Sequence, residues 1–134
     1  MSLLSEFSPW MALSDRRSIP RPGVYLIAPL NEIALGQTPS EIHALLYVGE
    51  ACDQTVSQRL SQFCRSAFRG LRAHSGGTRF NGFYQNADEN KYAFSVLVPE
   101  HQQPALSAYI RFVERAIIWE YVFQNNRFPP CNGK

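Results

Sequence analysis

The sequence predicts an α+β domain built on a small three-stranded sheet flanked by helices. Three apolar runs rich in β-formers, each bounded by glycine or proline, predict the strands. Longer segments with apolar residues at helical spacing predict the helices. The predicted order is β-β-α-β-α after a short amino-terminal helix. A chain of 134 residues corresponds to one domain, 1–134, in which residues 1–22 form an amino-terminal extension.

The composition excludes several classes of protein. Hydrophobic residues make up 45% of the chain and charged residues 18%, which excludes wholesale disorder. No apolar run approaches the roughly 18 residues of a membrane span. The first residues carry an acid and no basic segment, so we expect no secretory signal. Cys52, Cys64 and Cys131 follow no metal-site spacing, and we expect reduced thiols in a cytoplasmic protein.

The residue types of successive segments, taken in chain order, predict the strands. Residues 1–22 predict a short apolar helix and then a proline-punctuated entry into the sheet. Gly23–Ala28 is an apolar, β-rich run and predicts the first strand, followed by a loop over 29–41. Ala44–Val48 predicts a second buried strand that ends at a glycine. Tyr92–Val98 predicts the third strand, which a proline closes.

Two segments predict helices. Residues 53–72 place six apolar side chains on one face, with Asp53 as the expected N-cap: Val56, Leu60, Phe63, Cys64, Ala67 and Leu71. Glycines at the end of this segment and beyond it predict a loop: Gly70, Gly76, Gly77 and Gly82. A second helix is expected from Pro104 to about Gln124, where two asparagines and a pair of prolines end it.

The charge is unevenly distributed although the net charge is only +2. No acidic residue occurs from Gln54 to Ala87, and this stretch holds five arginines: Arg59, Arg65, Arg69, Arg72 and Arg79. On the predicted helix, Arg65, Arg69 and Arg72 lie opposite the apolar face, and Arg59 lies at its border. A solvated helix face would also carry charge, but such faces normally mix signs. Arginine without acid indicates contact with a polyanion, because the guanidinium matches phosphate bidentately.

Several short motifs occur in a fixed order. Gly23-Val24-Tyr25 lies on the first predicted strand, Tyr47-Val48-Gly49 ends the second, and Arg59 follows on the basic helix. Glu120 lies on the last helix, and Asn132 comes twelve residues later, after a proline-containing turn. Over residues 20–132 this pattern resembles the GIY-YIG nucleases, especially the nuclease domain of bacterial excision-repair enzymes. His74 is similar to a histidine that follows the arginine helix in phage homing nucleases.

The resemblance implies a metal-dependent endonuclease that hydrolyses phosphodiester bonds of DNA by in-line attack of water at a single divalent-metal site. Mg²⁺ or Mn²⁺ is the expected cofactor, since a hard cation is often held by one or two carboxylates, waters and the phosphate itself. Glu120 is the expected metal ligand. Arg59 is expected to stabilise charge on the scissile phosphate.

The remaining candidate catalytic residues have roles that the resemblance also implies. Either Tyr25 or Tyr47 would orient the attacking water or take its proton, and the sequence does not decide between them. Asn132 would order the site by hydrogen bonds. His74 would protonate the leaving group or contact phosphate, although a loop histidine beside glycines is commonly just exposed. Glu114 is the nearest competitor of the predicted metal ligand, and we expect it to face solvent.

The basic side chains imply how DNA would bind. Arg65, Arg69, Arg72 and Arg79 are expected to contact the phosphate backbone without reading bases. We expect the chain to lack the extra DNA-recognition domain of many such nucleases. It is therefore either structure-selective or weakly specific, or it relies on a separate targeting protein. We expect no membrane contact.

One departure from the pattern keeps alternatives open. Glu50 follows Gly49, and a carboxylate there would either join the metal or repel phosphate. The first alternative is a catalytically degenerate nucleic-acid-binding module with the same fold. The second is an unrelated α+β interaction domain in which the motifs are coincidental.

Overall fold

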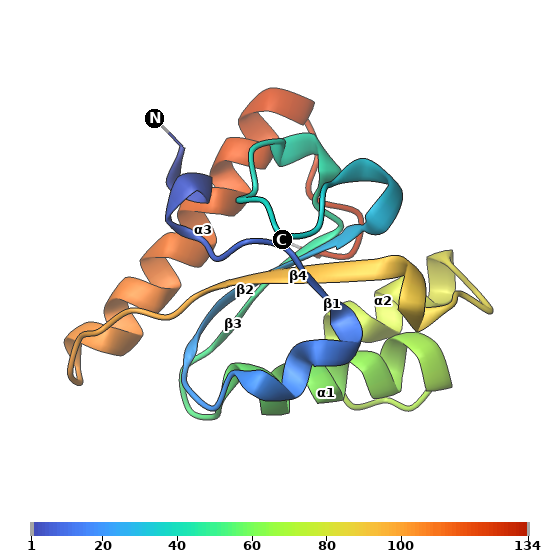
Figure 1. Cartoon of the computed structure of the whole chain (residues 1–134), viewed down its shortest axis with the longest axis horizontal. Helices are drawn as coiled ribbons and strands as arrows, with labels where there is room; N and C mark the ends of the chain where they lie inside the picture. Colours follow the sequence, from blue (N-terminus) through green and yellow to red (C-terminus); the bar gives the residue numbers. More distant parts are fainter. Residues whose placement is uncertain (1, 134) are drawn as a thin grey trace.

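A computed structural model describes residues 2–133. Four antiparallel strands form one sheet in the order β1-β4-β2-β3: β1 Met11–Ala12, β2 Gly23–Pro29, β3 Tyr47–Ala51 and β4 Tyr92–Leu97. The three α-helices are α1 Val56–Arg69, α2 Ser75–Phe83 and α3 Ala105–Asn125. Short 3-10 turns complete the fold: η1 Leu3–Glu6, η2 Leu13–Ser18, η3 Leu30–Glu32, η4 Ile42–Ala44 and η5 Glu89–Lys91. Figure 1 shows the sheet between α3 on one side and α1 with α2 on the other.

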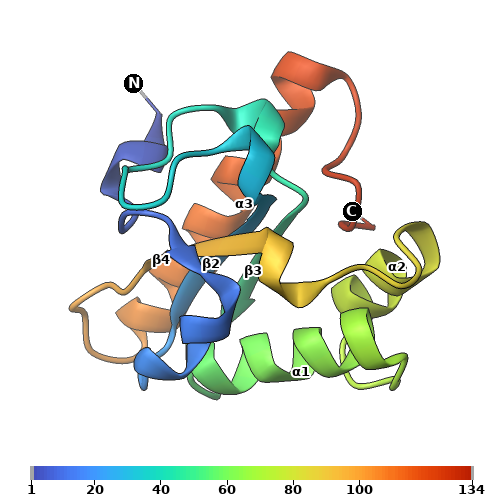
Figure 2. The same ribbon diagram turned by 45° about the vertical axis from the view of Figure 1, so that its right-hand side comes forward.

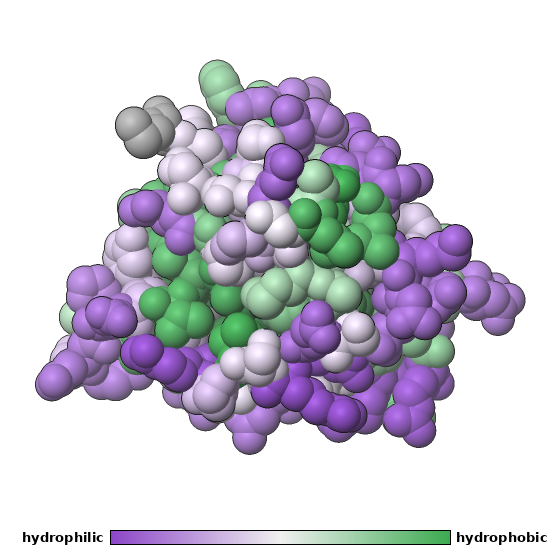
Figure 3. Space-filling view, in the orientation of Figure 1, coloured by the Kyte–Doolittle hydropathy of each residue, from purple (hydrophilic) through white to green (hydrophobic). Residues whose placement is uncertain are grey.

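The central strand β2 divides the interior into two cores. Alternate side chains point to opposite faces of a strand. Val24, Leu26 and Ala28 accordingly join the core under α3, and Tyr25 and Ile27 join the core under α1 and α2. Six consecutive residues of β2 are buried because helices cover both faces of the sheet. On the surface, apolar residues gather in the middle of one face, with hydrophilic side chains around the rim (Figure 3).

The structure confirms the predicted α+β class, but the sheet has four strands and not the three that the sequence predicted. The fourth strand, β1, pairs with β4 through Met11↔Phe94 and Ala12↔Ala93. Two residues are too short to show a strand periodicity, so the sequence pattern could not reveal it. The short helix expected within residues 1–22 is replaced by the 3-10 turns on either side of β1. This segment is part of the core, since it buries four apolar side chains: Leu4, Phe7, Trp10 and Leu13.

The second strand and the basic helix differ from expectation at their boundaries. β3 begins at Tyr47, because the expected strand start at Ala44 belongs to η4. Helix α1 begins at Val56, and Thr55 rather than Asp53 is its N-cap. The Thr55 hydroxyl accepts the backbone N–H of Gln58, whose side chain accepts the Thr55 N–H, which makes a complete capping box. The predicted apolar face is buried except for Leu71, which lies beyond the helix end.

Helix α2 occupies the segment that was expected to be a loop. Its glycines have low helix propensity, which is why the sequence pattern did not predict it. They are needed because α2 packs very closely on its neighbours. A Cβ on Gly76 would lie 2.4 Å from the Tyr47 ring, and one on Gly77 would lie 2.5 Å from the Phe63 carbonyl oxygen. The loop prediction is wrong because close packing outweighs intrinsic propensity here.

Helix α3 confirms the long predicted helix, and Asn126 ends it with a positive φ of 56°.

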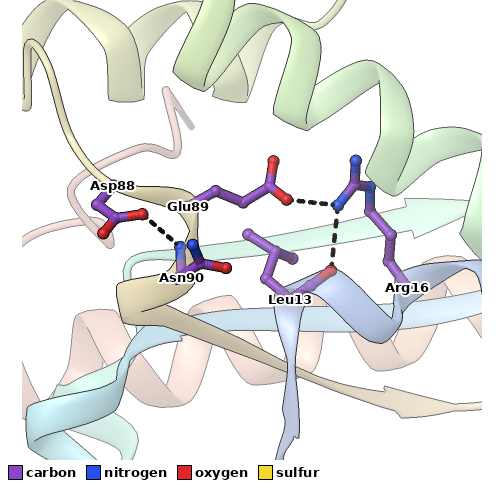
Figure 4. Close-up of polar contacts among 5 residues, drawn as sticks. All are labelled: Leu13, Arg16, Asp88, Glu89 and Asn90. Carbon is purple, nitrogen blue, oxygen red and sulfur yellow. Dashed lines mark hydrogen bonds and ion pairs between the residues drawn. The ribbon is translucent and has the colours of Figure 1, made fainter.

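At the other side of the sheet an ion pair joins η2 to η5 (Figure 4). Arg16 Nη1 lies 3.0 Å from Glu89 Oε2 and also donates to the Leu13 carbonyl. Asp88 caps η5 through the backbone N–H of Asn90. None of the helices within residues 2–133 has the length and apolar character that a bilayer crossing requires.

Candidate active site

The two motif tyrosines lie on neighbouring strands and point to the same face of the sheet. Tyr25 on β2 pairs across the strands with Gly49 on β3, and the ring centroids of Tyr25 and Tyr47 are 6.0 Å apart. A Cβ on Gly49 would lie 2.5 Å from Tyr25 Cζ and 2.6 Å from Tyr47 Cε2. The glycine of the second tripeptide therefore makes room for both rings.

His74 lies beside both tyrosines: it hydrogen-bonds the Tyr25 hydroxyl group, and its ring meets the Tyr47 ring edge-on. It is 4% exposed, although a loop histidine was expected to be accessible, and it is the N-cap of α2. His74 Nδ1 accepts the backbone N–H of Gly77 at 3.2 Å, and Nε2 lies 2.8 Å from the Tyr25 hydroxyl oxygen. Because Nδ1 accepts, the proton of the neutral ring is assigned to Nε2, which donates to Tyr25.

The protonation state of this group follows from its burial. Burial, aided by the Arg59 cation, lowers the pKa of His74 to about 3. The ring is therefore neutral near pH 7, and it is not a proton donor to a leaving group there. Its hydrogen bonds instead make it a positioning residue for Tyr25.

Burial also keeps both tyrosines protonated. It raises the pKa of Tyr25 well above its ordinary value and that of Tyr47 to about 12. Arg59 opposes this increase at both rings, whereas the carboxylates of Glu50 and Glu114 add to it. Arg59 is half-buried on α1 and donates from Nη1 to Gln62 Oε1 at 2.8 Å. Positive charge therefore reaches the tyrosine pair from α1.

A cleft of about 450 Å³ opens beside the edge strand β3. It lies where β3, α2, α3 and the segment after α3 meet, and eight residues line it: Tyr47, Ser75, Arg79, Glu114, Arg115, Cys131, Asn132 and Gly133. Tyr47 is the motif tyrosine that reaches this cleft, since Tyr25 is wholly buried. Both a carboxylate and arginines share the space, as required for binding a phosphate together with a cation.

The carboxylate in the cleft belongs to Glu114, not to Glu120. Glu114 was expected to face solvent, but it is half-buried and its pKa is raised to about 7 by burial and by Glu50. Glu120 lies elsewhere and accepts a hydrogen bond from the Ser2 hydroxyl at 2.9 Å. Six residues of helix rotate a side chain by about 240°, so the two glutamates cannot share a site. A helical projection contained this signal, because Glu114 borders the buried stripe of Ile110 and Ile117.

Asn132 holds the carboxy-terminal segment against β3. Its side-chain amide donates to the Val48 carbonyl and accepts the Val48 N–H, both at 2.9 Å. The neighbouring Cys131 N–H donates to the Leu46 carbonyl. This segment runs from the end of α3 to a position beside α2 (Figure 2). Asn132 therefore orders the cleft wall through the backbone of the edge strand.

Glu50 provides a second carboxylate near Glu114. Its Oε2 is buried without a hydrogen-bond partner among residues 2–133. Within that range no group of three or more His, Cys, Asp or Glu side chains forms a metal cluster. Two carboxylates nevertheless fit Mg²⁺ or Mn²⁺, since Mg²⁺ usually keeps several waters and uses one or two carboxylates plus phosphate. The orphaned buried oxygen of Glu50 is the observation that supports this fit.

The predicted DNA-binding arginines separate into two places. Arg65, Arg69 and Arg72 are exposed on α1 and on the turn after it, whereas Arg79 on α2 lines the cleft. None of these four belongs to an ion pair within the described part of the chain. Their positive charge is therefore not neutralised by neighbouring carboxylates there.

Comparisons with known proteins found no relative of this chain. No protein-family model, no curated protein and no solved structure matches the chain.

Proposed function

We propose that this chain is a metal-dependent endonuclease of the GIY-YIG type that hydrolyses phosphodiester bonds of DNA. One arrangement carries the proposal: Tyr47 and Glu114 line the same cleft, and Arg59 lies close enough to oppose the rise in the Tyr47 pKa. These are the three groups that a phosphodiester hydrolase needs: one to orient water, one to hold a cation and one to stabilise phosphate charge.

The metal would be held at the two carboxylates. Glu114, with Glu50 as the nearby second carboxylate, would bind Mg²⁺ or Mn²⁺, which supplies positive charge for binding a phosphate. This assignment replaces Glu120, whose carboxylate hydrogen-bonds Ser2 away from the cleft. Arg79 and Arg115 line the same cleft and would bind the flanking phosphates.

The protein side chains account for the rest of the hydrolysis. Tyr47 orients the attacking water, whose oxygen forms a bond to phosphorus while the ester bond on the opposite side breaks. Tyr47 keeps its own proton, because the effect of burial exceeds that of the Arg59 cation. It therefore positions the water by a hydrogen bond, and solvent in the open cleft takes the proton that the water loses and supplies the proton that the departing alcohol gains. Arg59 stabilises charge on the phosphate in the transition state. Tyr25 and His74 are buried behind Tyr47 and hold it in place.

One observation favours the alternative of a degenerate binding module. Glu50 and Glu114 place two carboxyl groups near the cleft, and without a cation their negative charge opposes phosphate binding there. The exposed arginines of α1 would then supply the affinity for nucleic acid. This alternative predicts binding that survives chelation of metal, and no cleavage.

Nicking of supercoiled plasmid tests the proposal. We expect the wild type to nick with Mg²⁺ or Mn²⁺ and to stop in EDTA. Glu114→Gln should lose about 100-fold or more of the rate, because metal stabilisation of the transition state is worth several kcal/mol. Glu120→Gln, the same change on the same helix, is the matched control and should keep the rate.

Other results would contradict parts of the proposal. Loss of nicking in Glu120→Gln but not in Glu114→Gln would overturn the assignment of the metal ligand. A wild type that retards plasmid on a gel without nicking it would establish the binding module instead. A wild type that neither nicks nor retards plasmid would refute the DNA-directed function.

A further inference from the structure

Helix α3 carries a stripe of exposed aromatic side chains on its outer face. Phe112, Trp119 and Phe123 are 59%, 64% and 73% exposed. Their spacing of seven and then four residues places them on one side of the helix. The Trp119 and Phe123 rings are stacked, with centroids 5.2 Å apart and an interplanar angle of 14°. Large apolar groups gathered on a surface indicate an interaction site.

The stripe is continuous with the cleft and is flanked by positive charge. Arg115 lines the cleft and lies three residues after Phe112 and four before Trp119, so it neighbours both on the helix surface. Arg111 lies one turn earlier on the same flank. Glu114 shares the cleft with Arg115, and both Arg115 and Arg111 oppose the rise of its pKa, whereas Glu120 hydrogen-bonds Ser2.

We infer that the aromatic stripe of α3 (Phe112, Trp119 and Phe123) stacks unpaired bases of a nucleic-acid strand that leaves the cleft. The inference rests on the proposed function, and it assigns a substrate class: nucleic acid with a single-stranded segment beside the scissile phosphate. Flat aromatic rings bind any base through its face, and arginines beside them bind the backbone. Bases within a duplex are already stacked on each other and do not present those faces.

Continuity with the cleft favours nucleic acid over a second copy of the chain as the occupant. In a two-fold dimer the same patch is used on both subunits. A second copy would cover the rings but would not account for the arginines of the adjoining cleft, whereas a strand that leaves the cleft contacts Arg115 and then the rings. A polyanion with aromatic bases matches both the rings and the cations.

The two tryptophans provide a direct readout. Trp10 is 4% exposed and Trp119 is 64% exposed, so added bases reach only Trp119. We use Glu114→Gln protein, which would not cut the probe, and titrate it with oligo(dT), with an abasic oligomer of equal charge and with a duplex. Oligo(dT) should quench tryptophan emission with saturation, whereas the abasic oligomer and the duplex should not. Trp119→Phe in the same background should remove the quench.

Affinity measured by anisotropy of labelled oligo(dT) completes the test. Trp119→Ala should weaken binding about tenfold, as expected for the loss of one stacked base. Leu35→Ala removes another exposed apolar side chain, away from α3, and should leave affinity unchanged. Both sites are exposed, so unchanged thermal unfolding of the variants confirms that they fold.

The two proposals fail separately. If the wild type nicks plasmid but Trp119→Ala binds oligo(dT) as the parent does, the stacking surface is refuted and the nuclease stands. If oligo(dT) quenches Trp119 but nothing is cut, the stacking surface stands and the nuclease fails. A wild type that sediments as a dimer and a Trp119→Ala variant that sediments as a monomer would assign the stripe to a second copy and overturn the inference.

Discussion

The buried histidine makes a sharp prediction about the pH dependence of stability. In the unfolded chain His74 titrates near its ordinary pKa of about 6.5, whereas in the folded protein its pKa is lowered to about 3. Between these values the unfolded state binds a proton that the folded state does not. The stability contributed by neutral His74 is therefore complete above pH 6.5 and is lost as pH falls toward 3.

The size of the effect on the unfolding free energy follows from the difference between the two pKa values of His74. Each pH unit below 6.5 costs about 1.4 kcal/mol, so lowering the pH to 4.5 costs about 2.7 kcal/mol. The assay is urea unfolding of the wild type and of His74→Gln from pH 8 to pH 4.5. Their difference in unfolding free energy cancels the titration of groups unaffected by the substitution. The wild type should be more stable at pH 8, because the variant loses a buried hydrogen bond to Tyr25.

The advantage of the wild type should then shrink as the pH is lowered. A gap of constant size from pH 8 to pH 4.5 would mean that His74 titrates alike in the folded and unfolded states. That result would refute the buried, neutral imidazole and with it the positioning role for Tyr25. Gln at this position cannot become charged, so the variant itself should lack this acid-dependent loss.

Two further predictions concern the steric and the electrostatic parts of the site. Gly49→Ala should lower the unfolding free energy by about 1–3 kcal/mol and reduce nicking, because the new methyl group overlaps both tyrosine rings. Gly82→Ala, on α2 with open space at its Cβ, is the control and should be neutral or slightly stabilising in the same urea titration. Replacing Arg65, Arg69 and Arg72 by alanine should weaken binding to all DNA sequences alike. It should also flatten the salt dependence of the binding constant by about 0.9 for each phosphate that the variant no longer neutralises. A weakening confined to one sequence would show base readout instead.

The sequence predicted those elements whose side-chain pattern is continuous and long. The apolar run of β2 and the 21-residue helix α3 belong to this group. It did not predict β1, which is only two residues long, or α2, whose glycines disfavour a helix in isolation. In both cases the element exists because of contacts distant in sequence: β1 through its pairing with β4, and α2 through close packing on α1 and Tyr47.

The candidate site shows a similar division between motif and geometry. The motifs on β2 and β3 located both tyrosines, because residues on adjacent strands have a fixed relation to one another. The sequence pattern selected Glu120 by its spacing to Asn132, whereas the helical phase of α3 places Glu114 at the cleft. Asn132 is held by the backbone of Val48, so its distance in sequence from a helical glutamate does not fix which face that glutamate occupies.

The motif residues differ in burial, and burial decides which of them can contact a substrate. A group that contacts substrate must reach the cleft, and among the tyrosines Tyr47 does so. Tyr25 is inaccessible to solvent, His74 is almost inaccessible, and the two side chains are hydrogen-bonded to each other. A motif residue can therefore be required without touching substrate. Substitution of Tyr25 would then act through the position of Tyr47, whereas substitution of Tyr47 would remove a group from the cleft itself.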